Sequence, residues 1–206
     1  MIKNKIKTQE EIVRIARRYR QCDKKVVTVN GSFDLLHLGH IRALEEAKKQ
    51  GDFLFVLLNS DQSVRLYKGV NRPINPQKER ASMMAALACV DFVTIFNEIN
   101  PKKILNKIKP HVHCNSSEWG RDCLEREIVE KNRGKIYILK QTHSHSTTQL
   151  INKILTEYAN LSAKAVFLDR DGTINFNQPE YLYQKKDFKF VPRAIPALQK
   201  LSQINY

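Results

Sequence analysis

The sequence has little that would direct the protein into a membrane or out of the cell. Its 206 residues contain no apolar run near the roughly 18 residues that span a bilayer. The amino terminus carries basic residues but lacks the apolar core of a signal peptide. The four cysteines form no Cys-x-x-Cys pair, which is typical of reduced thiols. We therefore expect a cytoplasmic protein with no membrane partner.

Although the net charge is +14, the basic residues are dispersed and lack the aromatic interleaving of single-strand binders. Such a charge suits a polyanionic partner, and nucleic acid is the first candidate. Phosphorylated small molecules fit equally well, so we expect no nucleic-acid partner. A non-catalytic binding module is an alternative that only the charge supports. Titration against duplex and single-stranded nucleic acid at two salt concentrations would test it.

Apolar runs that read as strands alternate with helical patterns along most of the chain. Strands are predicted at residues 26–30, 53–58, 92–96, 111–114 and 135–139. Helices are predicted at residues 8–20, 38–50, 75–88, from 101 onward, 121–132 and 147–158, with a basic loop after residue 61. This alternation predicts an α/β fold, a Rossmann-like open parallel sheet with helices on both faces. A truncated α/β segment follows, so we divide the chain into domains at 1–158 and 159–206.

Residues 26–40 organise the first domain. A buried Val- and Thr-rich strand leads into a short turn that carries His37 and His40 and then into a helix with Leu38, Ile41 and Leu44 on one face. Unpaired backbone N–H groups and the helix dipole favour an anion at such a junction. With two imidazoles added, the junction is predicted to bind phosphate and to stabilise developing charge.

Other polar residues also fall where predicted strands end. Asp61, residues 115–118 and residues 144–148 follow the second, fourth and fifth strands. Because the carboxyl ends of parallel strands meet at one edge of a sheet, we expect these groups to converge with His37 and His40.

Residues 31–40 match every position of a G-x-F-D-x-x-H-x-G-H signature, and Ser146-Thr147-Thr148 precedes the last predicted helix. In both features the chain resembles the cytidylyltransferase-like nucleotidyltransferase superfamily over residues 25–155. It is most similar to the heptose 1-phosphate adenylyltransferase domain of ADP-heptose synthesis. Four further segments of this chain have similar counterparts in that domain, namely Asn59-Ser60-Asp61, Lys68-Gly69, Arg72-Pro73 and Glu79-Arg80.

The resemblance implies that a sugar phosphate attacks the α-phosphorus of a nucleoside triphosphate and that pyrophosphate leaves. Catalysis is then assigned to His37 and His40, which donate to the phosphates, and to Lys68, which comes over from a flexible loop. The implied nucleotide-binding residues are Asn30, Gly31, Ser32, Phe33, His37, Gly39, His40, Asn115, Glu118, Ser146, Thr147 and Thr148. The implied substrate-binding residues are Asp34, Asp61, Lys68, Arg72 and Arg80. Mg²⁺ is expected with the triphosphate, held mainly by its phosphates.

The chain departs from this family in the loop that follows the fourth strand. Residues 114–120 replace a K-G-G-D-like stretch, and this loop is expected to line the acceptor or base pocket. ATP is the expected nucleotide, and CTP with glycerol phosphate or another polyol phosphate is the alternative. Trp119 could stack on a base or cover apolar surface of its own loop. His143 and His145 lie near the position where relatives that use glycerol phosphate carry an arginine-containing R-x-x-G-I-S-T-T motif.

A metal site built from His111, His113, Cys114, His143 and His145 is not expected. Imidazole and thiol groups suit zinc, but Cys114 should point away from the two strand histidines.

Residues 167–175 resemble the first motif of haloacid dehalogenase-like phosphatases, in the form found in heptose bisphosphate phosphatases. That resemblance implies a nucleophilic Asp169 and an acid/base Asp171, both near Mg²⁺ if the phosphatase domain is complete. Because the family's later elements do not follow, we expect residues 159–206 alone to lack phosphatase activity. Magnesium-dependent hydrolysis of a sugar bisphosphate that is lost in Asp169→Asn would overturn this expectation.

The pairing of the two segments fits consecutive steps toward nucleotide-activated heptose for surface polysaccharide. The alternative is that the chain is one half of a bifunctional protein whose phosphatase half hydrolyses a heptose bisphosphate. Relatives commonly form dimers, so the resemblance also implies a homodimer.

Overall fold

The computed structural model describes residues 2–116, 120, 122–140, 147–159, 168–169, 173–176 and 189–203. The chain divides into two compact units, Met1–Thr147 and Thr148–Tyr206. The helix that was expected to close the first domain therefore groups with the second unit. The predicted domain limit near residue 159 stays a prediction.

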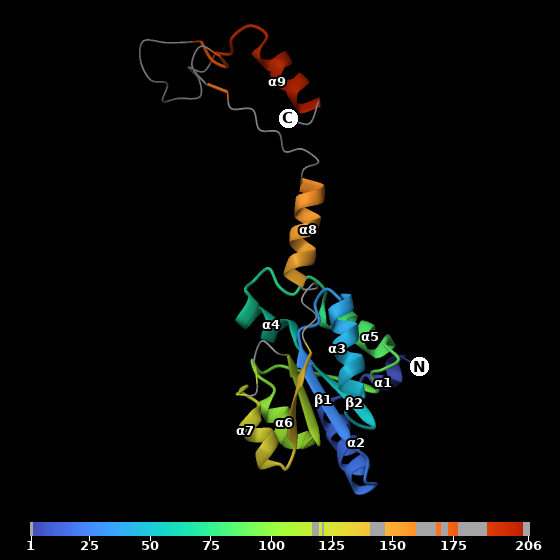
Figure 1. The fold of residues 1–206 in the computed structure, drawn as a ribbon. Helices are drawn as coiled ribbons and strands as arrows, with labels where there is room; N and C mark the ends of the chain where they lie inside the picture. Colours follow the sequence, from blue (N-terminus) through green and yellow to red (C-terminus); the bar gives the residue numbers. More distant parts are fainter. Residues whose placement is uncertain are drawn as a thin grey trace. The chain divides into compact units, whose positions relative to one another are not determined.

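A five-stranded parallel sheet forms the centre of the first unit (Figure 1). Its strands are β1 (Val26–Gly31), β2 (Phe53–Asn59), β3 (Phe92–Phe96), β4 (Val112–Ser116) and β5 (Lys135–Leu139). The order β3-β2-β1-β4-β5 makes the chain switch sides between β3 and β4. All five predicted strands and the Rossmann-like parallel arrangement are confirmed. Ligands of such sheets bind beyond the strand ends beside the switch point, here β1 and β4.

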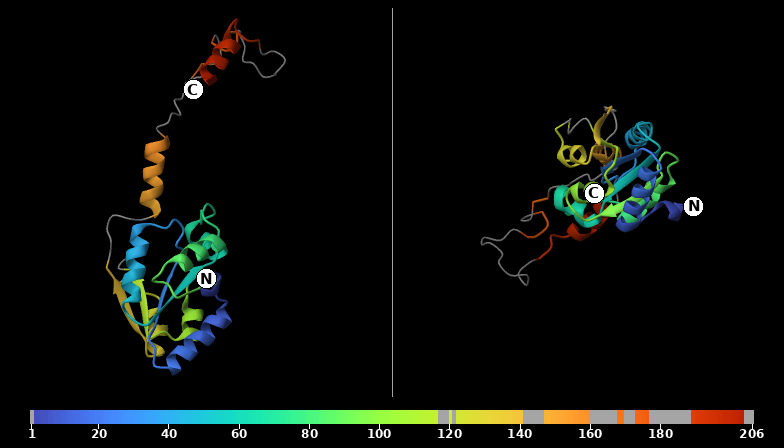
Figure 2. Two further views of the ribbon diagram at one scale, coloured as in Figure 1. Left: turned by 90° about the vertical axis from the view of Figure 1, so that its right-hand side faces the viewer. Right: turned by 90° about the horizontal axis from the view of Figure 1, so that it is seen from below.

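Helices cover both faces of this sheet, as predicted (Figures 1 and 2). They are α1 (Ile2–Lys5), α2 (Gln9–Gln21), α3 (Leu38–Lys48), α4 (Asp61–Lys68), α5 (Gln77–Ala86), α6 (Lys102–Ile108) and α7 (Arg126–Lys131). Buried residues of α3 and α5 pack in one cluster with Val27 and Val29 of β1. Those of α2, α6 and α7 pack in a second cluster with Phe55 and Leu57 of β2. The sheet is thus buried on both sides, which leaves its edges and strand ends to carry polar chemistry.

Helix α2 begins where the sequence predicts it. The Thr8 side chain accepts from Glu11 N at 3.2 Å, and a Glu11 carboxylate oxygen accepts from Thr8 N at 2.8 Å. This reciprocal pair satisfies two backbone donors that the first turn of a helix leaves open.

The prediction of a basic loop after β2 is wrong, because residues 61–68 form α4. Ser60 caps this helix by accepting from Ser63 N at 3.2 Å, and Val64 packs in the interior. Gly69 ends it with a φ of 91°, a conformation that glycine adopts without strain. Lys68 therefore stands in the last turn of a helix and not in a flexible loop.

Two further expectations need correction. Leu38 was placed on the buried face of α3 but is 44% exposed, because it lies in the first turn, ahead of the buried Leu44 and Ala47. The helix predicted from residue 121 begins only at Arg126.

In the second unit, the structure describes α8 (Thr147–Ala159) and α9 (Ala194–Gln203). An antiparallel bridge joins Asn175 to Phe190. Asp169 is exposed, whereas Asp171 lies outside the described residues. Within the described part of the chain, no helix combines the length and apolar character needed to cross a membrane.

Candidate active site

The turn between β1 and α3 brings the two predicted histidines together. His37 is the N-cap residue of α3, and its carbonyl accepts from His40 N at 2.9 Å. One turn of helix therefore separates the imidazoles, whose rings stack with centroids 3.7 Å apart and an interplanar angle of 22°. Both rings thus stand at the positive end of the α3 dipole, where anions are favoured.

His40 is held in its neutral form. The edge of the Phe33 ring packs on it at 5.2 Å between centroids. Burial lowers the pKa of His40 to about 4, and the neighbouring positive charges of His37 and Lys68 add to this shift. At neutral pH the ring therefore carries one N–H donor without a charge of its own. Its Nδ1 is buried and has no hydrogen-bond partner among the described residues.

A cavity of about 510 Å³ opens beside His40, at the carboxyl ends of β1, β2, β4 and β5. Seven of the predicted site residues line it, namely Asn30, Gly31, Ser32, Phe33, His40, Lys68 and Asn115. The cavity size suits a small-molecule ligand. The convergence of strand ends is therefore confirmed for β1 and β4, the strands beside the switch point.

Lys68 reaches this cavity from the end of α4. Its Nζ donates to Ser32 Oγ at 2.9 Å and lies 5.7 Å from the centre of the Tyr67 ring. The ammonium is thus placed on the same side of the cavity as the β1 turn.

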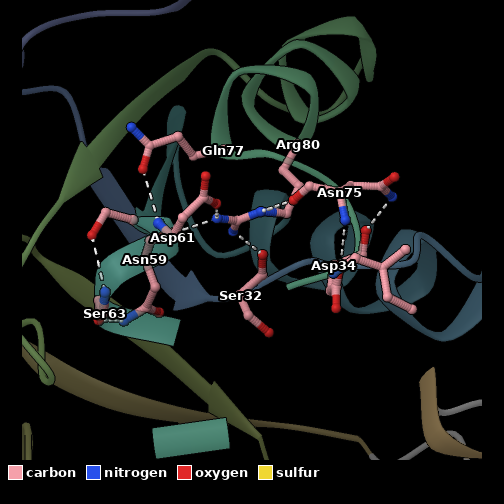
Figure 3. A network of polar contacts seen from close by, with 10 residues as sticks. Ser32, Asp34, Asn59, Asp61, Ser63, Asn75, Gln77 and Arg80 are labelled. Atoms are coloured by element: carbon pink, nitrogen blue, oxygen red, sulfur yellow. Dashed lines mark hydrogen bonds and ion pairs between the residues drawn. The ribbon is translucent and has the colours of Figure 1, made fainter. Parts of the chain in front are cut away.

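Arg80 holds the surrounding loops in place (Figure 3). Its side chain is fully buried, and its guanidinium donates to the carbonyl oxygens of Ser32, Asn59 and Asn75. It also forms an ion pair with Asp61 at 2.7 Å. A planar fork of five donors suits this set of acceptors, which come from the ends of β1 and β2 and from the start of α5.

Asp34 and Arg72 form a second anchor. A carboxylate oxygen of Asp34 accepts from Ile74 N at 2.8 Å and from Asn75 N at 3.0 Å. The other oxygen lies 3.0 Å from Arg72 Nη1, and Asp34 is 1% exposed. This anchor fixes the segment before α5 against the β1 turn.

Arg80 and Asp34 were predicted to bind the sugar phosphate, and the structure corrects both assignments. Neither side chain faces solvent, and the protein occupies their hydrogen-bonding groups. Asp61 and Arg72 are partly exposed, but each is engaged with one of the two anchors. We assign Arg80 and Asp34 to positioning the site.

The rest of the predicted set falls in three groups. His37 and Gly39 do not line the cavity, although His37 stacks on His40. Glu118, Trp119, His143, His145 and Ser146 lie outside the described residues. Thr147 and Thr148 form the first turn of α8, as predicted, and Thr148 belongs to the second unit.

Several polar residues that line the cavity were not predicted, among them Tyr67, Asn100 and Glu125. Tyr67 precedes Lys68, so recognition of α4 would have drawn attention to it. Glu125 lies in the stretch predicted as a helix over residues 121–132, and no local pattern marks it. Its carboxylate accepts from Asn115 Nδ2 at 3.2 Å across ten positions of the sequence.

Replacing Arg80 by leucine should destabilise the protein by about 3 kcal/mol or more. The change leaves Asp61 without its cation, and it leaves two buried carbonyl groups and one partly buried carbonyl group without a donor. Urea unfolding measures the effect, with Arg65→Leu on the exposed side of α4 as the matched control. A loss no larger than that of the control would contradict the anchoring role.

Stability should also fall as the pH is lowered from 7 to 5. The folded protein keeps His40 neutral down to about pH 4, whereas the unfolded chain binds a proton near the ordinary value of 6.5. The unfolded state therefore binds more protons in this window, which costs about 1 kcal/mol for this partly exposed ring. Unfolding experiments on His40→Asn should show a smaller dependence on pH, and Arg65→Ala should keep the wild-type slope. Equal slopes for His40→Asn and wild type would contradict the assignment.

Comparison with known proteins agrees with this geometry. The cytidylyltransferase-like family model matches residues 28–158, more than half of the chain. Among curated proteins, bifunctional protein HldE of Aliarcobacter butzleri is 41% identical over 150 residues, which cover 72% of this chain and 31% of that protein. HldE of Citrifermentans bemidjiense is 38% identical over 156 residues, covering 75% of this chain and 32% of that protein. The chain thus spans about a third of the length of these relatives.

A solved structure, the lipopolysaccharide core biosynthesis protein from Thermoplasma volcanium, matches with a TM-score of 0.50 and 28% identity. The match covers 57% of this chain and 98% of that one. The family match includes the β1 turn with both histidines, the anchoring arginine and the cavity. On this evidence the chain belongs to the cytidylyltransferase-like family.

Proposed function

We propose that the first unit is a nucleotidyltransferase domain that joins a sugar 1-phosphate to a nucleoside triphosphate and releases pyrophosphate. Heptose 1-phosphate is the preferred acceptor and ATP the preferred donor. Family membership and the likeness to HldE proteins support the reaction class. The observation that carries the proposal is the stacked pair His37 and His40 beside a cavity that Lys68 also lines.

The reaction needs no covalent intermediate on the protein. A phosphate oxygen of the sugar 1-phosphate attacks the α-phosphorus, and a new P–O bond forms. The bond between that phosphorus and the bridging oxygen to the β-phosphate breaks, and its electron pair leaves with pyrophosphate. Catalysis therefore consists of positioning the two substrates and stabilising charge on the transferring group.

The described side chains supply both contributions. The neutral His40 donates an N–H to a phosphate oxygen, while Lys68 brings a positive charge from its place near Ser32. The amino end of α3 adds the partial charge of its first backbone N–H groups. Because Arg80 and Asp34 fix the surrounding loops, these donors need little rearrangement when charge develops.

Mg²⁺ fits this site as a companion of the triphosphate. The described residues hold no group of three His, Cys, Asp or Glu side chains that could bind a metal ion. The cation would therefore be held mainly by phosphate oxygens. It would supply charge neutralisation to the triphosphate.

The finer assignments rest on likeness alone. Lys68-Gly69 and Arg72-Pro73 have similar counterparts in heptose 1-phosphate adenylyltransferases. We base the choice of ATP over CTP, and of heptose 1-phosphate as acceptor, on this resemblance. The likeness to bifunctional proteins supports a second activity in a longer protein, to which residues 159–206 would contribute. A homodimer in the cytoplasm and a place in surface polysaccharide synthesis belong to the same proposal.

Replacing His40 by alanine should lower the rate of nucleotide-sugar formation roughly 10²–10³-fold, the usual cost of one preorganised donor to developing charge. Single-turnover measurement of product and pyrophosphate tests this, and circular dichroism checks the fold. Arg65→Ala, an exposed change on α4, serves as the control and should keep wild-type rates. Wild-type activity in folded His40→Ala would remove the histidine from the mechanism.

A further inference from the structure

Glu125 is a buried carboxylate that the proposed reaction does not use. It is 7% exposed and lines the cavity together with Asn115 and Leu124. Burying a carboxylate costs free energy unless hydrogen-bond donors compensate for the lost water. Its donors therefore indicate what the group is there to bind.

One donor comes from the protein. Asn115 Nδ2 donates to Glu125 Oε2 at 3.2 Å, while Asn115 Oδ1 accepts from Ser116 N at 2.9 Å. The second bond fixes the Asn115 amide so that its NH₂ group faces the carboxylate. Among the described residues, the structure gives Glu125 Oε1 no hydrogen bond. A carboxylate only accepts, so this oxygen selects a ligand group that donates.

The charge of Glu125 excludes the phosphates of both substrates from its neighbourhood. The groups that attract phosphate, His40 and Lys68, come from the β1 turn and α4, whereas Glu125 enters with residues that follow β4. A neutral part of a substrate must therefore lie beside Glu125.

The apolar walls of the cavity favour a nucleobase over a sugar. Ile99 and Leu124 line the cavity yet are 58% and 60% exposed, and Pro101 and Leu139 add further apolar surface. Such walls pack against the flat faces of a base. A sugar with a hydroxyl on almost every carbon would leave most of these hydroxyls unpaired there.

We propose that Glu125 selects the nucleobase of the donor nucleotide by accepting a hydrogen bond from its exocyclic amino group. The inference rests on the proposed nucleotidyl transfer and extends it to base recognition. Adenine and cytosine carry such an amino group on the edge that a carboxylate reads. A base without an amino group at that position covers Glu125 Oε1 and leaves it unpaired, so the site rejects that base.

Nucleotide binding without acceptor tests this directly. Calorimetry on the full chain compares ATP with purine riboside triphosphate, and CTP with pyrimidin-2-one riboside triphosphate, two pairs that differ only in the amino group. Wild type should bind either ATP or CTP at least about tenfold more tightly than the matching analogue that lacks the amino group. A difference of about tenfold is what one hydrogen bond to a charged group contributes. The ratio should shrink in Glu125→Gln and approach one in Glu125→Leu.

The matched control is Glu127→Gln, an exposed change two positions away, which should keep the wild-type ratio. If Glu125→Leu does not fold, Glu125→Gln carries the test. A wild-type ratio near one, tighter binding of UTP or GTP than of both ATP and CTP, or a ratio unchanged in folded Glu125 variants would overturn the proposal.

The same data separate the two proposals. Amino-dependent binding without pyrophosphate release from any sugar phosphate would leave base selection standing while nucleotidyl transfer fails. If no nucleotide binds, both proposals fail.

Discussion

The geometry of the site depends on one buried guanidinium. Arg80 connects the carbonyl groups at the ends of β1 and β2 to the segment before α5, and its charge is balanced by Asp61. A parallel sheet brings strand ends to one edge but does not fix the loops beyond them. The guanidinium does so here by giving three backbone acceptors one rigid set of donors. The β1 turn, and with it the histidine pair, therefore takes its place from a residue that is fully buried.

The site so positioned separates two kinds of electrostatics. Toward the β1 turn, a neutral His40, the stacked His37, the Lys68 ammonium and the amino end of α3 favour anions. Toward β4, the buried Glu125 disfavours them. A nucleoside triphosphate has the same polarity, with charged phosphates at one end and a neutral base at the other. This correspondence orients the donor substrate in the proposed reaction.

The predictable parts of the structure were those that local pattern determines. Uninterrupted apolar runs gave all five strands, and the spacing of His37 and His40 gave their meeting at the start of α3. The burial of Arg80 was not predictable, because its hydrogen-bond partners lie up to 48 positions away in the sequence. A lone arginine on a helix is usually expected to be exposed. Helix α4 was missed since its basic residues resemble a loop, although Ser60 caps it. Glu125 gained its role from a tertiary contact with Asn115.

The proposed activity is nucleotidyl transfer to a sugar 1-phosphate in the cavity beside His40. A pyrophosphate-release screen of the four nucleoside triphosphates against a panel of sugar and polyol phosphates tests it most directly. We expect pyrophosphate release that requires both substrates, is strongest with ATP and heptose 1-phosphate, and is accompanied by a stoichiometric amount of nucleotide-sugar. Absence of release with every pair, or release that does not depend on the acceptor, would contradict it.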